Sequence, residues 1–420
     1  MKPLSEQVIV ITGASSGIGL VTARMAAEQG ARVLLVARNA AALADAVSAI
    51  RSAGGVADHA VADVGDAAQL SLAAEKALAC YGRIDAWVNC AGVAIYAPLL
   101  DTPHDEHHRL FRTNYFGTVH GCRIAVAHLR DRGGALITVG SITSELPTPI
   151  MGAYAASKHA AKAYVDGLRM EVMAAGLPIS VTLIKPSGID TPIARHAANH
   201  VEGEARIPPV VYDPALVARA ILDAAVHPRR EMTVGGVGRA QVLFGLHFPA
   251  MFDRLSRFMI PILSNPAVPK TLGDNLFAPM PDGSPRGAQP GRKTSGYTAA
   301  ERHSTATALG SLALLAAGAA LLARRRVGQT GAASHWTDTD LDLLHSLNEG
   351  GATQEQMARR LGRPVSEIHR VLPTVQSRPD RIPVQTADHG ANAWFGADEE
   401  GDVPPPTGRP LNDTAAWVHT

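Results

Sequence analysis

The sequence predicts an α/β fold in which helices cover both faces of a doubly wound parallel sheet of about seven strands. Up to residue 260, short apolar runs alternate with longer Ala-rich stretches of helical length. A glycine-rich turn, TGASSGIG, directly follows the first of these runs. With 420 residues and 46% hydrophobic side chains, the chain can also bury a large core. These observations place an α/β domain in the first 260 residues.

Seven apolar runs have the composition of buried strands: Val8–Thr12, Arg32–Ala37, Val56–Ala62, Ala86–Asn89, Ala135–Gly140, Ile179–Ile184 and Glu231–Val234. The predicted helices lie between them, near residues 18–29, 40–53, 67–80, 104–130, 154–175 and 214–226. Asp213 before Pro214 is typical of a helix start, because proline at the first helical position needs no backbone donor. The order of strands and helices is that of repeated βαβ units.

The charge balance excludes a chain that is drawn as a whole to nucleic acid or anionic lipid, since 39 basic side chains stand against 38 acidic ones. Cys80, Cys90 and Cys122 form neither an even set nor a Cys-x-x-Cys pair. This spacing argues against a disulfide-stapled secreted protein and against a zinc site, so no metal is expected. No secretory signal pattern precedes the first strand, and the first domain is therefore expected in the cytoplasm.

The character of the chain changes after residue 260, and 15 of the 28 prolines lie beyond this point. The predicted organisation is an α/β domain at 1–260, a linker or loosely attached arm at 264–303, a hydrophobic helix at 305–323, a small helical module at 336–372 and a disordered tail at 375–420. Residues 305–323 carry no charge and are mostly Ala and Leu, which makes them the candidate transmembrane helix. A buried or dimerising helix is the alternative.

The predicted C-terminal module contains three short helices, Asp338–Asn348, Gln354–Leu361 and Val365–Leu372, and resembles a helix-turn-helix. It has six carboxylates against four arginines. Because phosphate contacts dominate the affinity for DNA, a net negative module is a poor binder. Nucleic acid is therefore not an expected partner, and a protein contact or a purely structural role is favoured.

The turn TGASSGIG places Gly13, Gly17 and Gly19 between the first strand and the first helix. Without Cβ atoms the backbone can approach a pyrophosphate closely, and N–H groups at the helix N-terminus then face its charge. A glycine-rich turn alone is a weak signal, but its position between a strand and a helix favours dinucleotide binding.

The end of the second predicted strand indicates which dinucleotide is bound. An acidic side chain at this point bonds a ribose 2′-hydroxyl, whereas an arginine accommodates a 2′-phosphate. Here the strand ends in Arg38 and no carboxylate follows, which favours NADP over NAD. The alternative is that Arg38 is a solvated surface side chain, and Ser15 or Asn39 can modify the selectivity.

Tyr154 and Lys158 lie four residues apart in YAASK at a helix start, so both side chains emerge on one face. A nearby ammonium favours the phenolate and is expected to lower the pKa of the tyrosine. Ser141 follows the fifth predicted strand, where its hydroxyl can grip the same carbonyl oxygen as the tyrosine. The three residues together predict an acid/base site.

With these motifs in place, the sequence resembles the short-chain dehydrogenase/reductase family over about residues 5–240. The resemblance rests on TGASSGIG, Asp63 after the third strand, NCAG at 89–92, Asn114, Ser141 and YAASK. It implies a Rossmann-type sheet in which Tyr154 is the general acid/base and Ser141 polarises the substrate carbonyl. It also implies that Lys158 binds the nicotinamide ribose and that Asn114 holds a water that relays protons.

The same resemblance implies that Asp63 meets the adenine and that Asn89 and Gly92 shape the sheet beside the cofactor. The family's usual NNAG is NCAG here, and its Pro-Gly is Pro186–Ser187–Gly188, followed by Thr191 at the carboxamide. The full predicted cofactor set is Thr12, Gly13, Ser15, Gly17, Ile18, Gly19, Arg38, Asp63, Val64, Asn89, Gly92, Tyr154, Lys158, Pro186, Gly188, Ile189 and Thr191.

The expected function is therefore an NADP(H)-dependent oxidoreductase that interconverts a hydrophobic ketone or aldehyde and its alcohol. Apolar residues near the site, among them Leu146 and Met151, favour a hydrophobic substrate, although they can equally be lid packing. The alternative is an NADP(H)-sensing regulatory or scaffold protein that acts through the C-terminal module. A homo-oligomer is expected, and membrane association would follow from residues 305–323. The apolar stripe Phe244, Phe248 and Phe252 predicts core or dimer packing ahead of lipid contact.

Overall fold

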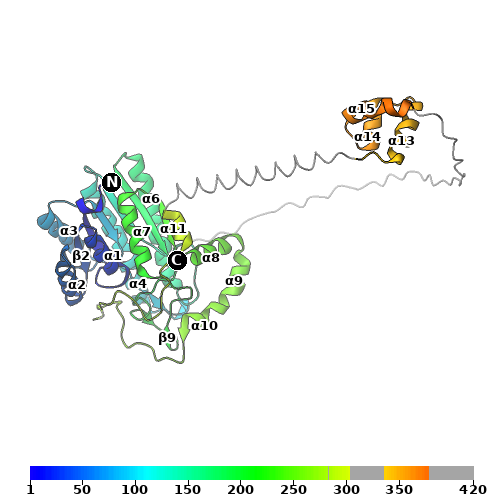
Figure 1. Ribbon diagram of the computed structural model, residues 1–420. Helices are drawn as coiled ribbons and strands as arrows, with labels where there is room; N and C mark the ends of the chain where they lie inside the picture. The colour runs from blue at the N-terminus through cyan, green and yellow to red at the C-terminus, as the bar shows by residue number, and fades with distance from the viewer. Residues whose placement is uncertain (282, 303–334, 378–420) are drawn as a thin grey trace, which may run out of the picture. The chain divides into compact units, whose positions relative to one another are not determined.

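The computed structural model describes residues 1–281, 283–302 and 335–377. The chain divides into two compact units, residues 1–320 and 321–420, which are described separately below. In the first unit, seven parallel strands are β1 (Val8–Thr12), β2 (Arg32–Ala37), β3 (Val56–Val61), β4 (Ala86–Asn89), β6 (Gly134–Val139), β7 (Ile179–Pro186) and β10 (Glu231–Val234). Their order in the sheet is β10-β7-β6-β4-β1-β2-β3, which confirms the predicted doubly wound fold (Figure 1).

The strand order reverses between β1 and β4, and the chain winds outward from this point in both directions. The two central strands pair in register through Ile9 with Ala86 and Ile11 with Val88. Because the strands are parallel, their carboxyl ends meet at one edge of the sheet. A crevice at this edge, beside the reversal, is where open α/β sheets bind ligands.

Helices cover both faces of the sheet. They are α1 (Gly17–Glu28), α2 (Ala40–Ser52), α3 (Ala67–Tyr81), α4 (His104–Phe111), α5 (Gly117–Leu129), α6 (Gly152–Ala174) and α7 (Pro214–Val226). One apolar core joins the sheet to α1, α2 and α7, and includes Leu20, Leu43 and Ile221. The other joins it to α3, α5 and α6, and includes Leu70 and Val165.

The helix predicted at 104–130 is interrupted. It consists of α4, a π-helical turn η3 (Arg112–Phe116) and α5. One extra residue in a helical turn shifts the side chains that follow, and such turns are frequent at functional sites. Asn114 lies inside this turn and is fully buried.

After β10 the chain forms α8 (Gly236–His247), α9 (Pro249–Ser256), the short turn η5 (Arg257–Met259) and α10 (Ile260–Leu263). The predicted phenylalanine stripe is divided between α8 and α9, because Pro249 starts a new helix after the bend at Phe248. Two short strand pairs flank the crevice: β5 (Ile95–Tyr96) with β8 (Ala198–Asn199), and β9 (Glu204–Ala205) with β11 (Ser264–Asn265).

Residues 264–302, which we call the arm, cover most of the predicted linker. The first compact unit includes them, and they end in α11 (Gly296–Arg302). The arm is bonded to the α/β domain at several points, for example by Arg286 to Asp213 at 3.0 Å. A segment rich in proline and glycine can therefore pack closely when its backbone groups find partners on a neighbouring surface.

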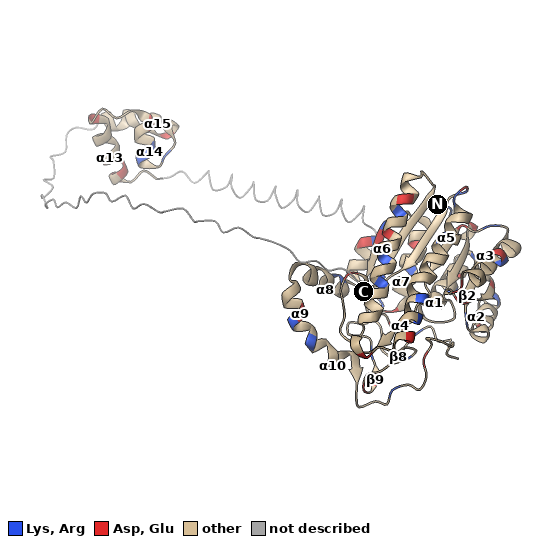
Figure 2. Cartoon of the chain, turned by 180° about the vertical axis from the view of Figure 1, so that it is seen from behind, with Lys and Arg blue, Asp and Glu red and all other residues tan. Residues whose placement is uncertain are grey.

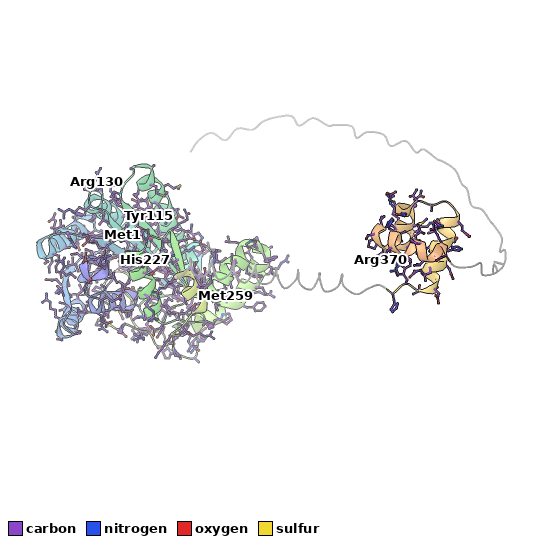
Figure 3. The ribbon with its side chains drawn as sticks, turned by 45° about the horizontal axis from the view of Figure 1, so that its top comes forward. Met1, Tyr115, Arg130, His227, Met259 and Arg370 are labelled. Carbon is purple, nitrogen blue, oxygen red and sulfur yellow. The ribbon has the colours of Figure 1, made fainter. Side chains whose placement is uncertain are left out.

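The second unit contains α13 (Asp338–Glu349), α14 (Gln354–Leu361) and α15 (Val365–Gln376), at the positions of the predicted short helices. Their small core includes Leu344, Met357 and Ile368, whereas Arg370, labelled in Figure 3, is exposed. The predicted hydrophobic helix at 305–323 and the tail from residue 378 lie outside the described residues. Within the described residues, no helix is both long and apolar enough to cross a membrane.

Candidate active site

The glycine-rich turn links β1 to α1 and can be built only with glycine at two of its positions. Gly17 has a φ of +52°, in the left-handed region that favours glycine. A Cβ on Gly19 would lie 2.3 Å from the carbonyl oxygen of Gly13. The turn therefore carries no side chain at these two positions, as close contact with a pyrophosphate requires, while the N–H of Gly17 donates to the carbonyl oxygen of Ser284 at 3.0 Å.

Thr12 and Asn89 lie at the ends of β1 and β4, beside this turn. The Thr12 hydroxyl accepts hydrogen bonds from the N–H groups of Cys90 at 3.0 Å and Ala91 at 3.2 Å, and so ties the end of β1 to the end of β4. The buried Asn89 amide accepts from Trp87 at 2.8 Å. Both side chains act within the protein, and neither lines the pocket described next.

A pocket with about 970 Å³ of empty space lies over the glycine-rich turn. Three groups of predicted cofactor residues line it, from the turn itself, from the end of β2 and from the region after β3: Gly13, Ser15, Gly17, Ile18, Gly19, Arg38, Asp63 and Val64. Gly92 and Thr191 close its inner end. The elongated lining set fits a dinucleotide whose pyrophosphate lies at the N-terminus of α1.

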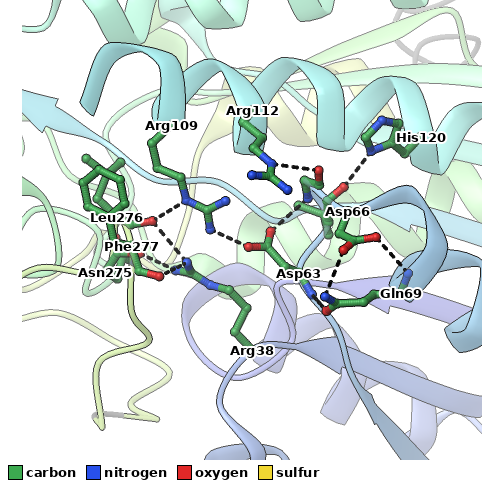
Figure 4. A network of polar contacts seen from close by, with 12 residues as sticks. Arg38, Asp63, Asp66, Gln69, Arg109, Arg112, His120, Asn275, Leu276 and Phe277 are labelled. Carbon is green, nitrogen blue, oxygen red and sulfur yellow. Dashed lines mark hydrogen bonds and ion pairs between the residues drawn. The ribbon is translucent and has the colours of Figure 1, made fainter. Parts of the chain in front are cut away.

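A network of three charged side chains lies at the outer end of this pocket (Figure 4). Arg109 donates one hydrogen bond to Asp63 at 2.5 Å and another to the carbonyl oxygen of Leu276 at 2.8 Å. Burial raises the pKa of Asp63, but the bonds and charge of Arg109 outweigh it, so the pKa lies below its ordinary value. Burial lowers the pKa of Arg38, and the neighbouring Arg109 lowers it further. Arg109 was not predicted, because it is 46 residues from Asp63 in the sequence.

Asn114 forms hydrogen bonds with the segment that follows β4 and with α6. Its side chain accepts from the N–H of Val93 at 2.9 Å and donates to the carbonyl oxygen of Val93 and to Ser157, both at 3.0 Å. The π-helical turn brings the amide to this position between α6 and the loop after β4. The amide lines neither large pocket, so its effect on the site runs through the Val93 loop and α6.

Ser141 and Tyr154 form the polar centre of the site. The Ser141 oxygen accepts from the N–H of Thr143 at 3.1 Å. Burial raises the pKa of Tyr154 to about 12, although a hydrogen bond with Ser141 lowers it in part. The predicted lowering of this pKa by Lys158 is therefore not seen, because desolvation of the phenol outweighs the effects of its neighbours.

Lys158 is buried beside Tyr154, with its Nζ 5.8 Å from the centre of the phenol ring. The Nζ donates to the carbonyl oxygen of Val139 at 3.1 Å. Desolvation lowers its pKa to about 8, while the Cys90 thiol acts in the opposite direction. A Cβ on Gly92 would lie 3.6 Å from this Nζ, so the glycine leaves room above the ammonium.

A second pocket, with about 1080 Å³ of empty space, opens over Ser141, Tyr154 and Lys158. Its wall is largely apolar and includes the predicted Leu146, Met151 and Ile189. The wall also includes Tyr96, which the sequence did not indicate, and Ile207, which lies in the loop 193–212 that the sequence predicts to close over the substrate. Phe252 and Met259 line it too, although the sequence assigned their apolar stripe to core or dimer packing. Ile18, Gly92 and Thr191 line both pockets, so the two spaces adjoin at the polar centre.

Most of the predicted site residues therefore lie together. Pro186, Gly188 and Ile189 line the second pocket, as do Tyr154 and Lys158. Such an arrangement can hold a nucleotide along the glycine-rich turn and place a carbonyl or hydroxyl group at Ser141 and Tyr154. These features define an oxidoreductase of the class that binds a nicotinamide dinucleotide on a Rossmann-type sheet.

Comparison with known proteins agrees with this class. The matching family model is that of the short chain dehydrogenase, over residues 7–202. Over 258 residues the chain is 44% identical to the uncharacterized oxidoreductase YxnA of Bacillus subtilis, covering 61% of this chain and 72% of that protein. It is 31% identical to dehydrogenase/reductase SDR family member 7B of Danio rerio over 267 residues, covering 60% of this chain and 85% of that protein.

A solved structure is similar as well. The short chain dehydrogenase/reductase from Burkholderia phymatum in complex with NAD matches with a TM-score of 0.53 and 26% identity, covering 65% of this chain and all of that one. The chain belongs to the short-chain dehydrogenase/reductase family.

Proposed function

We propose that this protein is an NADP(H)-dependent reductase that interconverts a hydrophobic ketone or aldehyde and its alcohol. The observation that carries the proposal is the position of Ser141, Tyr154 and Lys158 where the nucleotide pocket and the apolar pocket adjoin. The nucleotide pocket suits the cofactor, because the glycine-rich turn, the end of β2 and the region after β3 all line it. A nicotinamide dinucleotide bound there supplies the hydride.

The residues of the chain provide the proton and the orientation. The Ser141 hydroxyl, which accepts from the N–H of Thr143, would orient the substrate by donating a hydrogen bond to its oxygen and would keep its own proton. Tyr154, whose pKa burial raises to about 12, holds its proton at neutral pH and can deliver it to the oxygen of a carbonyl that is being reduced. Lys158 lies close enough to bind a ribose hydroxyl and to influence the phenol.

The wall of the second pocket supports an apolar substrate. Leu146, Phe252 and Met259 enclose the space beyond the polar centre. Burial of a hydrocarbon group against such side chains contributes about 25 cal/mol per Å² of surface removed from water. Polar side chains such as Thr143, Thr148 and Gln241 also line this wall. Its larger apolar part favours a ketone or aldehyde with one large apolar substituent.

The preference for NADP(H) rests on Arg38 at the end of β2. No carboxylate at the end of β2 takes the place that would bond a ribose 2′-hydroxyl, and a guanidinium suits a phosphate. The related protein from Burkholderia phymatum binds NAD, so the choice needs its own test. Changing Arg38→Asp should shift the ratio of kcat/KM for NADPH and NADH toward NADH, because the new carboxylate repels the 2′-phosphate. An unchanged ratio would contradict the role of Arg38.

The activity is tested with a panel of carbonyl compounds and alcohols, with NADPH or NADH and their oxidised forms, read by cofactor absorbance. On a verified substrate, Tyr154→Phe should lower kcat by about 10²–10⁴-fold and leave the NADPH dissociation constant close to that of the wild type. Full turnover in the variant would remove Tyr154 from its role. A protein that binds NADPH tightly but turns over none of the panel would favour the alternative of an NADP(H) sensor.

Homo-oligomerisation and membrane association remain predictions. The helices after β10 expose several large apolar side chains: Leu246, Phe248, Met251, Leu255, Phe258 and Ile262. Arg254 in α9 and Arg257 in η5 add basic side chains to this region (Figure 2). Light scattering during size-exclusion chromatography tests self-association, and sedimentation with anionic vesicles tests membrane binding.

A further inference from the structure

The described residues 274–281 and 283–289 of the arm, which we call the strap, form the outer wall of the nucleotide pocket. Asn275, Pro279 and Met280 line it opposite the glycine-rich turn. Asn39 donates to the carbonyl oxygen of Met280 at 2.7 Å. The N–H of Gly17 donates to the carbonyl oxygen of Ser284 at 3.0 Å. The strap is thus bonded to the same turn and strand end that are proposed to hold the dinucleotide.

One residue of the strap anchors it in the α/β domain. The side chain of Leu276 is 0% exposed and belongs to an apolar cluster with Leu110 and Ala197. Its carbonyl oxygen accepts from Arg109 at 2.8 Å and from Arg38 at 3.1 Å. The backbone of the preceding residue is held too, since the N–H of Asn275 donates to the carbonyl oxygen of His196 at 2.8 Å.

Arg38 is the centre of this attachment. Its guanidinium donates to the carbonyl oxygens of Asn275 and Leu276, and to that of Phe277 at 3.2 Å (Figure 4). It is therefore not the solvated surface arginine that the sequence left as an alternative. The N–H groups that would bind a 2′-phosphate are engaged by neutral carbonyl groups of the same chain.

A phosphate forms stronger hydrogen bonds with a guanidinium than a carbonyl does, because both partners are charged. Both Asp63 and Asp274 act electrostatically on the half-buried Arg38, and Asp274 belongs to the strap. When the strap is released, Arg38 and Arg109 keep only Asp63 as a counter-charge, so a second anion is then electrostatically favoured at this point. A ribose 2′-hydroxyl carries no charge and has no comparable advantage over the carbonyl groups.

We propose that the strap and the 2′-phosphate of NADP(H) compete for Arg38, so that NADP(H) releases residues 275–277 from the guanidinium while NAD(H) leaves them docked. The inference rests on the proposed role of Arg38 in binding the 2′-phosphate. The strap then helps to determine cofactor specificity, because the 2′-phosphate can bind Arg38 only after it displaces the carbonyl groups of the strap. Leu276 and Arg109 are then positioning residues that hold the carbonyl groups in place.

Hydrogen exchange of the full chain tests the release. The probes are 2′,5′-ADP, which carries the 2′-phosphate, and 5′-AMP, which lacks it, each at a saturating concentration. The amides of Asn275 and Leu276 should exchange about tenfold faster with 2′,5′-ADP than with 5′-AMP. Equal exchange with both probes, or slower exchange with 2′,5′-ADP, would overturn the competition.

A matched pair of variants tests the same competition through affinity. Leu276→Ala removes the buried anchor, whereas Leu272→Ala changes a side chain of the arm that is 90% exposed. With a loosened strap, Leu276→Ala should bind 2′,5′-ADP about tenfold more tightly and 5′-AMP unchanged. Leu272→Ala should bind both as the wild type does. If Leu276→Ala binds both probes more weakly, the strap supports the wall of the nucleotide pocket and does not compete with the 2′-phosphate. This result would refute the proposal.

Arg38→Ala separates this inference from the proposed function. If this variant binds 2′,5′-ADP as tightly as the wild type, Arg38 does not hold the phosphate, and the cofactor assignment fails together with the competition. If it binds 2′,5′-ADP more weakly, yet the strap of the wild-type protein exchanges equally with both probes, the cofactor assignment stands and only the competition fails.

Discussion

The buried lysine of the active site should lower the stability of the protein, and replacing it should reveal by how much. In the unfolded chain Lys158 titrates near its ordinary pKa of 10.5, whereas desolvation lowers this pKa to about 8 in the folded protein. Below pH 8 the amine is protonated in both states, and the folded state bears the full cost of a buried charge. Above pH 10.5 the amine is neutral in both states, and this cost is absent.

The difference between these two pKa values corresponds to about 3 kcal/mol, at about 1.4 kcal/mol for each tenfold change in proton affinity. Lys158→Met keeps an unbranched side chain but loses the hydrogen bond to Val139, which contributes about 1 kcal/mol. The variant should therefore be more stable than the wild type by about 2 kcal/mol at pH 7. For a domain of this size the gain raises the Tm by about 4–8 °C.

The assay is thermal and denaturant unfolding of the cofactor-free protein at several pH values. The advantage of Lys158→Met should shrink between about pH 8 and 10.5. In this range the lysine is neutral in the folded protein but protonated in the unfolded chain, so unfolding takes up a proton and the wild type gains stability as the pH rises. Lys162, one turn further along α6, forms an ion pair with Asp166 at 2.7 Å, so Lys162→Met should not be more stable at pH 7. A Lys158→Met protein that is no more stable than the wild type at pH 7, or whose advantage is independent of pH, would refute the reasoning.

Two further predictions concern the cysteines and the C-terminal unit. Burial raises the pKa of the Cys90 thiol to about 12, so at pH 8 iodoacetamide should modify the exposed Cys80 at least about tenfold faster than Cys90. Mass spectrometry follows the two rates, and equal rates would contradict this effect of burial on Cys90. In the C-terminal unit, Leu344→Ala removes a fully buried side chain and should cost about 2–5 kcal/mol, enough to unfold so small a unit. The exposed Leu343→Ala is its control, and NMR spectra of the full chain that show residues 335–377 folded in both variants would contradict this expectation.

The strands and the polar centre could be predicted from the sequence because their signals are local. The strand at Val8–Thr12 is a continuous apolar run, and its glycine-rich turn follows without a gap. Tyr154 and Lys158 lie on one helix, so their spacing alone brings them together. Each of these features depends on residues that are neighbours in the chain.

The features that escaped prediction depend on distant partners. The π-helical turn at Asn114 interrupts a stretch whose residues all suit an α-helix, and its reason is the bond to Val93 21 residues away. The raised pKa of Tyr154 reflects how completely the tertiary fold excludes water. The apolar residues of the arm are few and follow no regular period. A packed arm therefore has the same local sequence pattern as a free linker. Its attachment to Arg38 spans more than 230 residues of sequence.

The last helix of the arm also bears on how the protein avoids aggregation. β10 is the outermost strand of the sheet and pairs only with β7, so the backbone N–H groups on its other side need partners. α11 provides them: Glu301 accepts from the N–H of Thr233 at 3.1 Å, and the Thr298 hydroxyl accepts from the N–H of Gly235 at 3.0 Å. An uncovered strand edge is a template on which a second chain can add its own strand. A protein shortened to end before Gly296 would expose this edge, and precipitation of such a protein would report an unprotected strand rather than a defect in the catalytic residues.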